Sequence, residues 1–313
     1  RIETLQGTLE IPTIPASSAG PDIREMILGS EGRLGLITEV KARVTRLPEH
    51  ERFHVAFFPN WDKARTAARA LVQNRIQLSM LRLSNAIETE TQLALAGHPG
   101  LISLLEKFLS LRGADDGKCM MTFGVTGSKD QASASLKQAR KVCKEHDGVY
   151  TGTKLGSKWA EKRFTMPYLR EALWQMGYAV DTLETATDWD NVDSLLEKME
   201  TSLRTGLEDK QEKCHVFTHL SHFYSQGCSI YTTYVFRVAD TYAETLERWK
   251  HLKNTTSEII VRNGGTISHQ HGVGKDHAPF MPVEKGELGM QAIRALTTSF
   301  DPDKRLNPTT LLD

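Results

Sequence analysis

The stretch CMMTFGVTGSKDQASASLKQARKVCKEHDG, residues 119–148, decides the fold because it holds one strand and one helix in direct succession. Residues 119–127 form a short, mostly apolar run, which is typical of a buried strand. Residues 128–147 mix polar and apolar side chains as a helix does, and Gly148 is the residue type that commonly ends one. The stretch therefore predicts a strand–helix unit in the middle of the chain.

The same alternation of strands and helices extends from this unit in both directions. The sequence predicts strands at 53–58, 78–84, 178–184, 214–223 and 228–238, and helices at 60–75, 86–111 with a break at GHPG, 189–206 and 241–265. The order β-α-β, followed later by β-α-β-β-α, is that of ferredoxin-like split βαβ units. We therefore expect an α+β domain with a mostly antiparallel sheet and its helices on one side.

Both ends of the chain differ from this middle part. A short helix is predicted at 23–28 with Asp22 as its N-cap, and the alternating pattern of residues 36–47 predicts a half-buried strand. Residues 281–313 predict a helix and a proline-containing tail, which could return to the domain of the first residues. Because the chain opens without Met and in what reads as mid-structure, we expect it to begin inside a domain.

The composition argues against several classes of function. Lys plus Arg and Asp plus Glu both count 39, so the formal net charge is zero and gives no support for nucleic-acid binding. The four cysteines are not in CxxC spacing, which argues against a zinc site built from cysteine and for reduced thiols. No apolar run approaches the ~18 residues that a membrane span needs.

The stretch GTISHQHGVGKDH, residues 265–277, carries three histidines and a lysine. On an extended segment His269 and His271 share a face, so both imidazoles could converge on one ligand. A metal ion would need a third ligand, which one of three other histidines could supply: His219, His222 or His277. No HExxH motif supports a metal site, however, so no metal is expected. A catalytic or anion-binding role, with Lys275 as a point charge for phosphate, and a simple polar loop both stay open.

Apolar neighbours surround two arginines and a tyrosine in the sequence. A polar side chain in such surroundings needs a hydrogen-bond or charge partner. Arg82 on the strand at 78–84 and Arg163 beside aromatic residues are costly to bury unless paired. An anionic substrate group or an internal ion pair would satisfy each of them. Tyr231 and Tyr234 lie at odd separation on a predicted strand, so they face opposite sides and one of them belongs to the core. The other could shuttle a proton near the histidine pair.

The glycine-rich loop GSEGRLGLIT, residues 29–38, could present backbone N–H groups to a phosphate. It matches neither GxGxxG nor GxxxxGK[ST]. Its spacing therefore leaves a functional loop and a structural turn equally open.

Four segments in chain order resemble one group of enzymes. GSEGRLGLITE at 29–39 resembles the FAD-domain segment of the vanillyl-alcohol-oxidase-type flavoproteins, usually written GSEGTLGVITE, and SFDPDKRLNP at 299–308 resembles their carboxy-terminal ending. The segments at 163–190 and 265–275 are more specific and resemble the alkyldihydroxyacetonephosphate synthase family, which shows a histidine triplet followed by GVGK. The resemblance covers essentially the whole chain.

The resemblance implies a domain organisation. Residues 1–47 would be the second part of a VAO/PCMH-type FAD-binding domain, residues 48–274 a ferredoxin-like cap or substrate domain, and residues 275–313 the return to the FAD-binding domain. The first FAD subdomain, which carries the pyrophosphate loop in the family, would precede residue 1 and is expected as a missing partner.

The resemblance also implies FAD as cofactor and a transferase reaction. The family exchanges the acyl group of acyl-dihydroxyacetone phosphate for a fatty alcohol in ether-lipid synthesis. By this resemblance the catalytic residues are Tyr231, His269 and His271. The substrate-binding residues would be Arg82, Arg163, Gln270 and Lys275. The cofactor-binding residues would be Gly29, Ser30, Glu31, Gly32, Gly35, Ile37 and Asn307. Gln270 replaces the middle histidine of the family's triplet, which bears on whether the chemistry and substrate are the same.

Two other readings compete with this one. An FAD-dependent 2-hydroxy-acid dehydrogenase or oxidase of the D-lactate, glycolate or 2-hydroxyglutarate type typically shows HxGDGNxH and then EHG, where this chain has HFYSQGCSI at 222–230 and HQHG. A binding or assembly module without activity is the other. We further expect a lipid substrate, a homodimer, peripheral membrane contact and no nucleic acid. The expected location is cytoplasmic or membrane-peripheral, and peroxisomal in a eukaryote.

Overall fold

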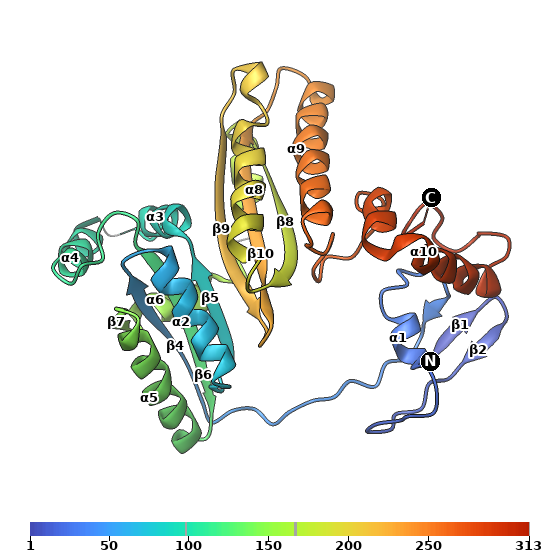
Figure 1. The fold of residues 1–313 in the computed structure, drawn as a ribbon, viewed down its shortest axis with the longest axis horizontal. Coiled ribbons are helices and arrows are strands. Elements are labelled where there is room, and N and C mark those ends of the chain that lie inside the picture. Colours follow the sequence, from blue (N-terminus) through green and yellow to red (C-terminus); the bar gives the residue numbers. More distant parts are fainter. Residues whose placement is uncertain (98, 166–167, 313) are drawn as a thin grey trace. The chain divides into compact units, whose positions relative to one another are not determined.

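The computed structural model describes residues 1–97, 99–165 and 168–312 and divides into two compact units. The first unit comprises Arg1–Arg46 and Ile260–Asp313, and the second comprises Leu47–Ile259. Figure 1 labels most of the helices and strands of both units.

The first unit joins the two ends of the chain around a small antiparallel sheet of order β2-β1-β3. Ile2, Ile27 and Leu34 form a buried cluster against helix α10. The N-cap prediction is confirmed, because the side chain of Asp22 accepts a hydrogen bond from the backbone N–H of Arg24. The elements of this unit are β1 (Ile2–Thr4), β2 (Gly7–Leu9), α1 (Ile23–Ile27), β3 (Leu36–Ile37), η3 (Ala278–Phe280) and α10 (Met281–Phe300).

The predicted strand at 36–47 is wrong beyond Ile37. Strand β3 pairs with β1 through Ile2 with Ile37 and Glu3 with Leu36. The side chains of Val40 and Val44 are 73% and 84% exposed. Alternating apolar residues form a strand only where a neighbouring strand takes up the backbone groups.

The second unit is built on one antiparallel sheet of order β7-β4-β6-β5-β9-β10-β8. Its strands are β4 (His50–Phe58), β5 (Met80–Ser84), β6 (Cys119–Gly127), β7 (Val149–Gly152), β8 (Tyr178–Asp188), β9 (Cys214–Phe223) and β10 (Gly227–Arg237). Its helices are α2 (Trp61–Gln73), α3 (Ala86–Leu95), α4 (Pro99–Ser110), α5 (Lys129–Glu145), α6 (Lys154–Lys162), α7 (Leu169–Gln175), α8 (Val192–Thr205), η2 (Glu208–Lys210) and α9 (Tyr242–Arg262), which the division between the units cuts near its end.

This sheet consists of two related halves. The order β4-α2-β5-β6-α5-β7 along the chain and β7-β4-β6-β5 in space is a split βαβ unit of the ferredoxin-like type. The segment β8-α8-β9-β10-α9 repeats this arrangement without its fourth strand. Pairing of Leu83 with Leu220 and of Ser84 with His219 joins the halves. The predicted α+β class and antiparallel sheet are confirmed.

Helices cover both faces of the first half of the sheet. Helices α2, α5, α8 and α9 lie on one face, and Figure 1 shows α8 lying over β9 and β10. On the other face, Leu93 of α3, Leu109 of α4 and Leu155 of α6 pack with Val55 and Phe57 of β4. The prediction of helices on one side is therefore wrong for α3, α4 and α6. The physical reason is that residues 53–58 are all buried, so that β4 needs cover on both faces.

Residues 149–176 hold β7, α6 and α7, which the sequence analysis does not predict. The usual start signal is missing for these two helices, because the N-cap side chains of Thr153 and Tyr168 make no capping hydrogen bond. His98, inside the predicted GHPG break, and Met166 and Pro167, inside the segment 163–190, lie outside the described residues.

The second expected domain boundary, at residue 274, differs from the division between the units. Residues 260–274 pack in the first unit, because Ile267 lies in a cluster with Met281 and Met290. The expected first boundary, at residue 47, nearly coincides with the division after Arg46. The stretch with the histidine pair therefore belongs to the first unit.

Candidate functional site

A row of polar residues crosses four strands on one face of the sheet in the second unit. The strand registers place Ser84 opposite His219, His219 opposite Tyr231, and Tyr231 opposite Glu184. Residues that face each other in antiparallel strands point to the same side of the sheet. Arg82 points to that side as well, because it precedes Ser84 by two positions on β5.

Glu88, from the first turn of α3, binds two members of this row. Its Oε1 atom lies 2.6 Å from Nη2 of Arg82 and 3.1 Å from Nδ1 of His219. Glu88 is 2% exposed and His219 is 6% exposed. The His219 ring in turn stacks on the Tyr231 ring, with 4.7 Å between ring centroids and 20° between planes. Of the two ways to satisfy Arg82 that the sequence leaves open, the internal ion pair is present.

The charges in this network shift the pKa values of its members. Burial alone would raise the pKa of Glu88, but His219 and Arg82 hold that pKa well below its usual range. Burial and the charge of Arg82 lower the pKa of His219, although Glu88 acts in the opposite direction. Around neutral pH, Glu88 is therefore ionised and His219 is neutral.

These shifts predict a loss of stability in acid. Because the pKa of Glu88 is lower in the folded state than the ordinary 4.5, its contribution is complete above pH 4.5 and is lost as the pH falls further. Each tenfold difference in proton affinity between the folded and unfolded states corresponds to about 1.4 kcal/mol. Melting curves at about pH 5 and 3.5 should show a smaller acid-induced decrease in melting temperature for Glu88→Gln than for the unmodified protein. Equal decreases in both proteins would contradict the ion-pair account.

The two tyrosines of β10 occupy different environments, as their odd separation predicts. Tyr234 is 0% exposed, and its hydroxyl donates a hydrogen bond of 3.2 Å to Asp181. It is the core tyrosine. Tyr231 is half-buried on the opposite face, where it contacts His219.

Two cavities adjoin the part of the sheet around Arg82. One, of about 440 Å³, is lined by Arg82, Trp159 and His222 among other residues. The other, of about 410 Å³, is largely apolar, with Val55 and Thr122 of the sheet and Leu93, Leu155 and Trp159 of the helices among the residues that line it. Thr122 pairs with both Val55 and Arg82, so this apolar cavity lies one strand from the polar row.

Arg163, the other predicted substrate-binding arginine, lies among aromatic rings at the end of α6. Its guanidinium carbon is 4.7 Å from the ring centre of Phe164, 5.5 Å from that of Phe53 and 5.7 Å from that of Trp159. These cation–π contacts account for its position without a substrate.

In the first unit, Glu31 ties the glycine-rich loop to the histidine-containing stretch. Its carboxylate accepts hydrogen bonds from the backbone N–H groups of Val273 and Gly274, the latter at 2.8 Å. Its carbonyl accepts a hydrogen bond of 2.6 Å from the side chain of Asn307. Glu31 and Asn307 are two of the predicted cofactor-binding residues. Their polar groups form these hydrogen bonds with other parts of the protein. The backbone amides after Gly272, which an anion could have occupied, bind Glu31.

The remaining residues of the glycine-rich loop are placed by the same small sheet. Gly35 packs so closely against β1 that a Cβ atom there would lie 2.6 Å from the carbonyl oxygen of Glu3. Ile37 pairs with Ile2 at the end of β3. Gly32 has a φ of +82° and faces Asn307. Close packing therefore accounts for the identity of Gly35, and the pairing with Ile2 accounts for the position of Ile37.

The histidine pair is not on an extended segment. Gln270 has a φ of 63°, in the left-handed region, so that the chain turns between His269 and His271. The premise that both imidazoles share the face of a strand is therefore wrong. His269 is half-buried, whereas Gln270, His271 and Lys275 are exposed within the unit.

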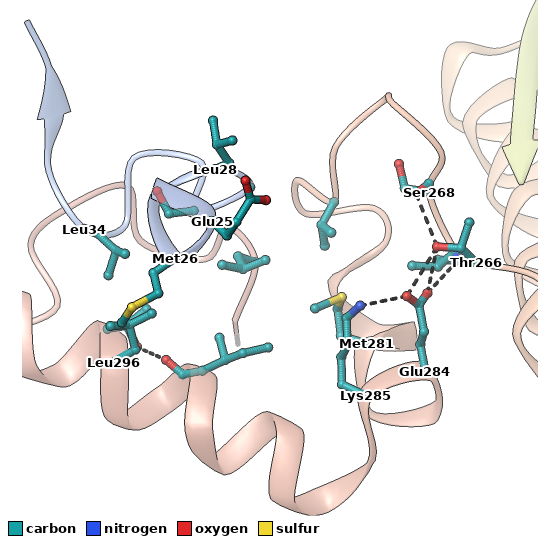
Figure 2. Close-up of a pocket in the computed structure, with 17 residues that line it drawn as sticks. Glu25, Met26, Leu28, Leu34, Thr266, Ser268, Met281, Glu284, Lys285 and Leu296 are labelled. Carbon is teal, nitrogen blue, oxygen red and sulfur yellow. Dashed lines mark hydrogen bonds and ion pairs between the residues drawn. The ribbon is translucent and has the colours of Figure 1, made fainter. Parts of the chain in front are cut away.

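A cavity of about 390 Å³ adjoins the glycine-rich loop in the first unit. Gly29 and Ser30 line it together with Thr266, Ser268 and Glu284. Figure 2 shows Glu284 turned toward Thr266, whose hydroxyl lies 3.2 Å from its Oε2 atom. The buried hydroxyl of Ser268 has no hydrogen-bond partner among the residues that the structure describes, and it would suit a ligand in this cavity.

Comparison with known proteins identifies the family. Residues 47–311 match the family described as FAD linked oxidases, C-terminal domain. The chain belongs to this family. The resemblance that the sequence motifs indicate is confirmed at this level, and so is the fold that it implies.

Individual relatives agree with this assignment. An alkyldihydroxyacetonephosphate synthase of Trypanosoma brucei brucei is 28% identical over 319 residues, which cover 100% of this chain and 52% of that protein. A solved structure of alkyldihydroxyacetonephosphate synthase superposes with a TM-score of 0.74 at 24% identity, covering 98% of this chain and 52% of the other, which shows a common fold. A glycolate oxidase subunit of Bacillus subtilis is 22% identical over 291 residues, covering 93% of this chain and 57% of that protein. The chain thus spans about half the length of the relatives it matches.

Glu88 is not among the site residues predicted from the sequence, and His219 is among them only as a possible metal ligand. The signal for Glu88 was present, because Asn85-x-x-Glu88 has the spacing of a helix N-terminus with an acidic third residue. The structure confirms Asn85 as the N-cap, with its side chain accepting from the Glu88 N–H at 2.9 Å. The carboxylate, however, turns to Arg82 and His219, which no local pattern reveals.

Proposed function

We propose that the protein is an FAD-dependent transferase of the alkyldihydroxyacetonephosphate synthase type, which exchanges the acyl group of acyl-dihydroxyacetone phosphate for a fatty alcohol. The observation that carries this proposal is the apolar cavity next to the polar row on one face of the sheet. An amphiphilic substrate needs such a pair of environments, one for its hydrocarbon chain and one for its head group. The volume of about 410 Å³ lies in the ~300–1,000 Å³ range of ligand cavities.

The residues of the polar row suit the chemical steps of this exchange. Loss of a proton from the substrate carbon requires a base within hydrogen-bond reach, and Tyr231 stacked on neutral His219 is the proposed group. Arg82 supplies a fixed positive charge for an anionic head group, as do Arg163 and Lys275 in the proposal. His269, His271 and Gln270 remain proposed contacts from the histidine-containing stretch.

The cavity of the first unit suits one part of the proposed cofactor. Gly29 and Ser30 present backbone to the cavity, and Ser268 offers an unused hydroxyl. Glu25 and Glu284 also line it, so an uncharged ring of FAD fits better there than the pyrophosphate does. When bound, FAD would supply the electrophilic centre for the exchange. We propose that Gly29, Ser30 and Gly32 contact FAD, that Glu31, Gly35, Ile37 and Asn307 hold the loop in shape, and that a further FAD subdomain completes the site.

We extend the proposal to the setting of the enzyme. A homodimer and peripheral contact with a membrane would suit a lipid substrate, at a cytoplasmic, membrane-peripheral or peroxisomal location. Among the described residues, no helix has the length and apolar character that a membrane span requires.

The proposal is tested by assaying the full-length protein with palmitoyl-dihydroxyacetone phosphate and hexadecanol, alongside a panel of 2-hydroxy acids with a dye acceptor. We expect a yellow protein that forms the ether product and releases palmitate. A colourless preparation without flavin absorption would contradict the cofactor assignment. Turnover of a 2-hydroxy acid alone would favour the second candidate, a 2-hydroxy-acid dehydrogenase, which the likeness to the glycolate oxidase subunit supports.

Narrowing the apolar cavity should discriminate against long chains. Ala96 lines the cavity at the end of α3, so the substitution Ala96→Trp would place an indole in the volume proposed for the hydrocarbon chain. We expect kcat/KM for hexadecanol to fall about 10-fold or more while that for octanol changes little, since each displaced methylene is worth roughly 1 kcal/mol. The matched control is Ala94→Trp on the exposed side of the same helix. If kcat/KM fell equally for both alcohols, the hydrocarbon chain of the substrate would not occupy this cavity.

A further inference from the structure

Glu88 joins two functional groups through a single oxygen atom. Its Oε1 atom contacts Nη2 of Arg82 and Nδ1 of His219, and those two nitrogens are themselves 3.1 Å apart. The three side chains form a closed triangle in which Glu88 is the only anion. Because both cationic and neutral donors converge on one carboxylate oxygen, neither Arg82 nor His219 can rotate without losing a charge-assisted hydrogen bond.

The ionised carboxylate also decides which nitrogen of His219 carries its proton. With Nδ1 protonated, the imidazole donates to Glu88 at 3.1 Å. With Nδ1 unprotonated, Nη2 of Arg82 could donate to it at 3.1 Å, but the lone pair of Nδ1 would then face the ionised oxygen of Glu88 in a buried site, which is unfavourable. The carboxylate thus favours the proton on Nδ1, which leaves Nε2 as a hydrogen-bond acceptor.

The position of Glu88 is itself held from the opposite side of the sheet. Asn85, which caps α3 and accepts from the Glu88 N–H, donates from its side chain to Glu200 of α8 at 2.8 Å. Glu200 also accepts from Thr218, which lies beside His219 on β9 but faces the other way. Helix α3 thus begins at a fixed point, and its first turn brings Glu88 against Arg82 and His219.

We propose that Glu88 is a positioning residue, which holds Arg82 and His219 in fixed orientation beside Tyr231 and keeps the proton of His219 on Nδ1. The charged or titratable groups that face His219 include Arg82 from β5, Glu88 from α3, Glu184 from β8 and Tyr231 from β10. Glu88 is in direct contact with both Arg82 and His219. The kinetic consequence rests on the proposed function, whereas the placement of the proton does not.

Nitrogen-15 NMR of the full-length protein with labelled histidine tests the proton placement whether or not the enzyme turns over. We expect neutral His219 to carry its proton on Nδ1 in the unmodified protein. In Glu88→Gln, the titration of His219 should move to lower pH, because the lost negative charge favoured the imidazolium form. The matched control is Glu90→Gln, which removes an exposed carboxylate from the same helix and should leave the His219 signals unchanged. An unprotonated Nδ1, or equal titrations in all three proteins, would overturn the inference.

Kinetics test the positioning role separately. Glu88→Gln should lower kcat about 10–100-fold with KM nearly unchanged and flavin retained, the effect of losing charge-assisted hydrogen bonds to groups that act in the transition state. If Gln prevents folding, Glu88→Asp keeps the charge but withdraws the oxygen, and we expect an intermediate loss of kcat with the His219 titration preserved. An unchanged kcat in both variants would refute the positioning role. An unmodified protein without ether-forming activity would refute the proposed function, while the NMR result would still decide the proton placement.

Discussion

Substitution of Tyr231 by Phe is expected to lower kcat for the acyl-to-alkyl exchange by about 10²–10⁴-fold, the contribution of a positioned acid–base group. Flavin should stay bound. The ring of Phe can keep the stacking on His219, and the strand register opposite Glu184 is unaffected, so the change removes only the hydroxyl. The measurement is product formation in the ether-lipid assay together with the flavin absorption spectrum of the purified variant.

Tyr234→Phe is the matched control on the same strand. Tyr234 is fully buried on the other face, and its hydroxyl bonds Asp181, so its loss should cost about 1 kcal/mol of folding free energy. We expect kcat within about threefold of the unmodified protein, because a stability change that leaves the site intact does not alter the barrier. Retained activity in Tyr231→Phe, or an equal loss in Tyr234→Phe, would rule out the proton-transfer role.

Substitution of Glu31 by Ala is expected to lower the free energy of unfolding of the first unit by about 2–4 kcal/mol, the range for losing two hydrogen bonds to a partly buried charged group. The backbone N–H groups of Val273 and Gly274 would lose their acceptor. The turn at Gln270 and Gly272, with φ of 63° and 78°, would lose the contact that holds it. We therefore also expect faster flavin release and a large loss of activity, measured by thermal melting and flavin fluorescence.

Two variants test this account of Glu31. Glu31→Gln keeps one acceptor oxygen and should lose about half as much stability, because the charge is gone but one hydrogen bond can remain. Glu25→Ala removes an exposed carboxylate whose only described ion pair, with Arg24, is at the surface, and should change stability by less than about 0.5 kcal/mol. A Glu31→Ala protein as stable as Glu25→Ala would show that the histidine-containing stretch is held by other contacts.

Much of the fold could be predicted from local pattern. Strands β6 and β9 and helix α2 lie at or within a few residues of their predicted ranges, because apolar periodicity and caps such as Asn60 act over one or two turns. The order of these elements also sufficed for the ferredoxin-like topology. The failed strand at 38–47 shows the limit, since alternation says nothing about whether a partner strand is present.

The candidate site could be predicted where a property depends on a residue and its sequence neighbours, but not where it depends on two residues far apart in the sequence. The odd separation of Tyr231 and Tyr234 along one strand was enough to place them on opposite faces of the sheet. The resemblance supplied the family, which the match over residues 47–311 confirms. Glu88 and His219, by contrast, are 131 positions apart and come together only because β5 and β9 pair in the sheet.

The amino-acid sequence alone determined the class of fold, the family and the residue types available for chemistry, because periodicity, caps and motifs are local properties of the chain. Only the tertiary structure decided which charges meet: Glu88 with Arg82 and His219, and Glu31 with the backbone after Gly272. The physical reason is that burying a carboxylate is favourable only where donors converge on it, and donors from separate strands and loops converge through register and packing. Arg82 and Glu31, first taken as ligand contacts, are thus also the residues that hold their surroundings in place.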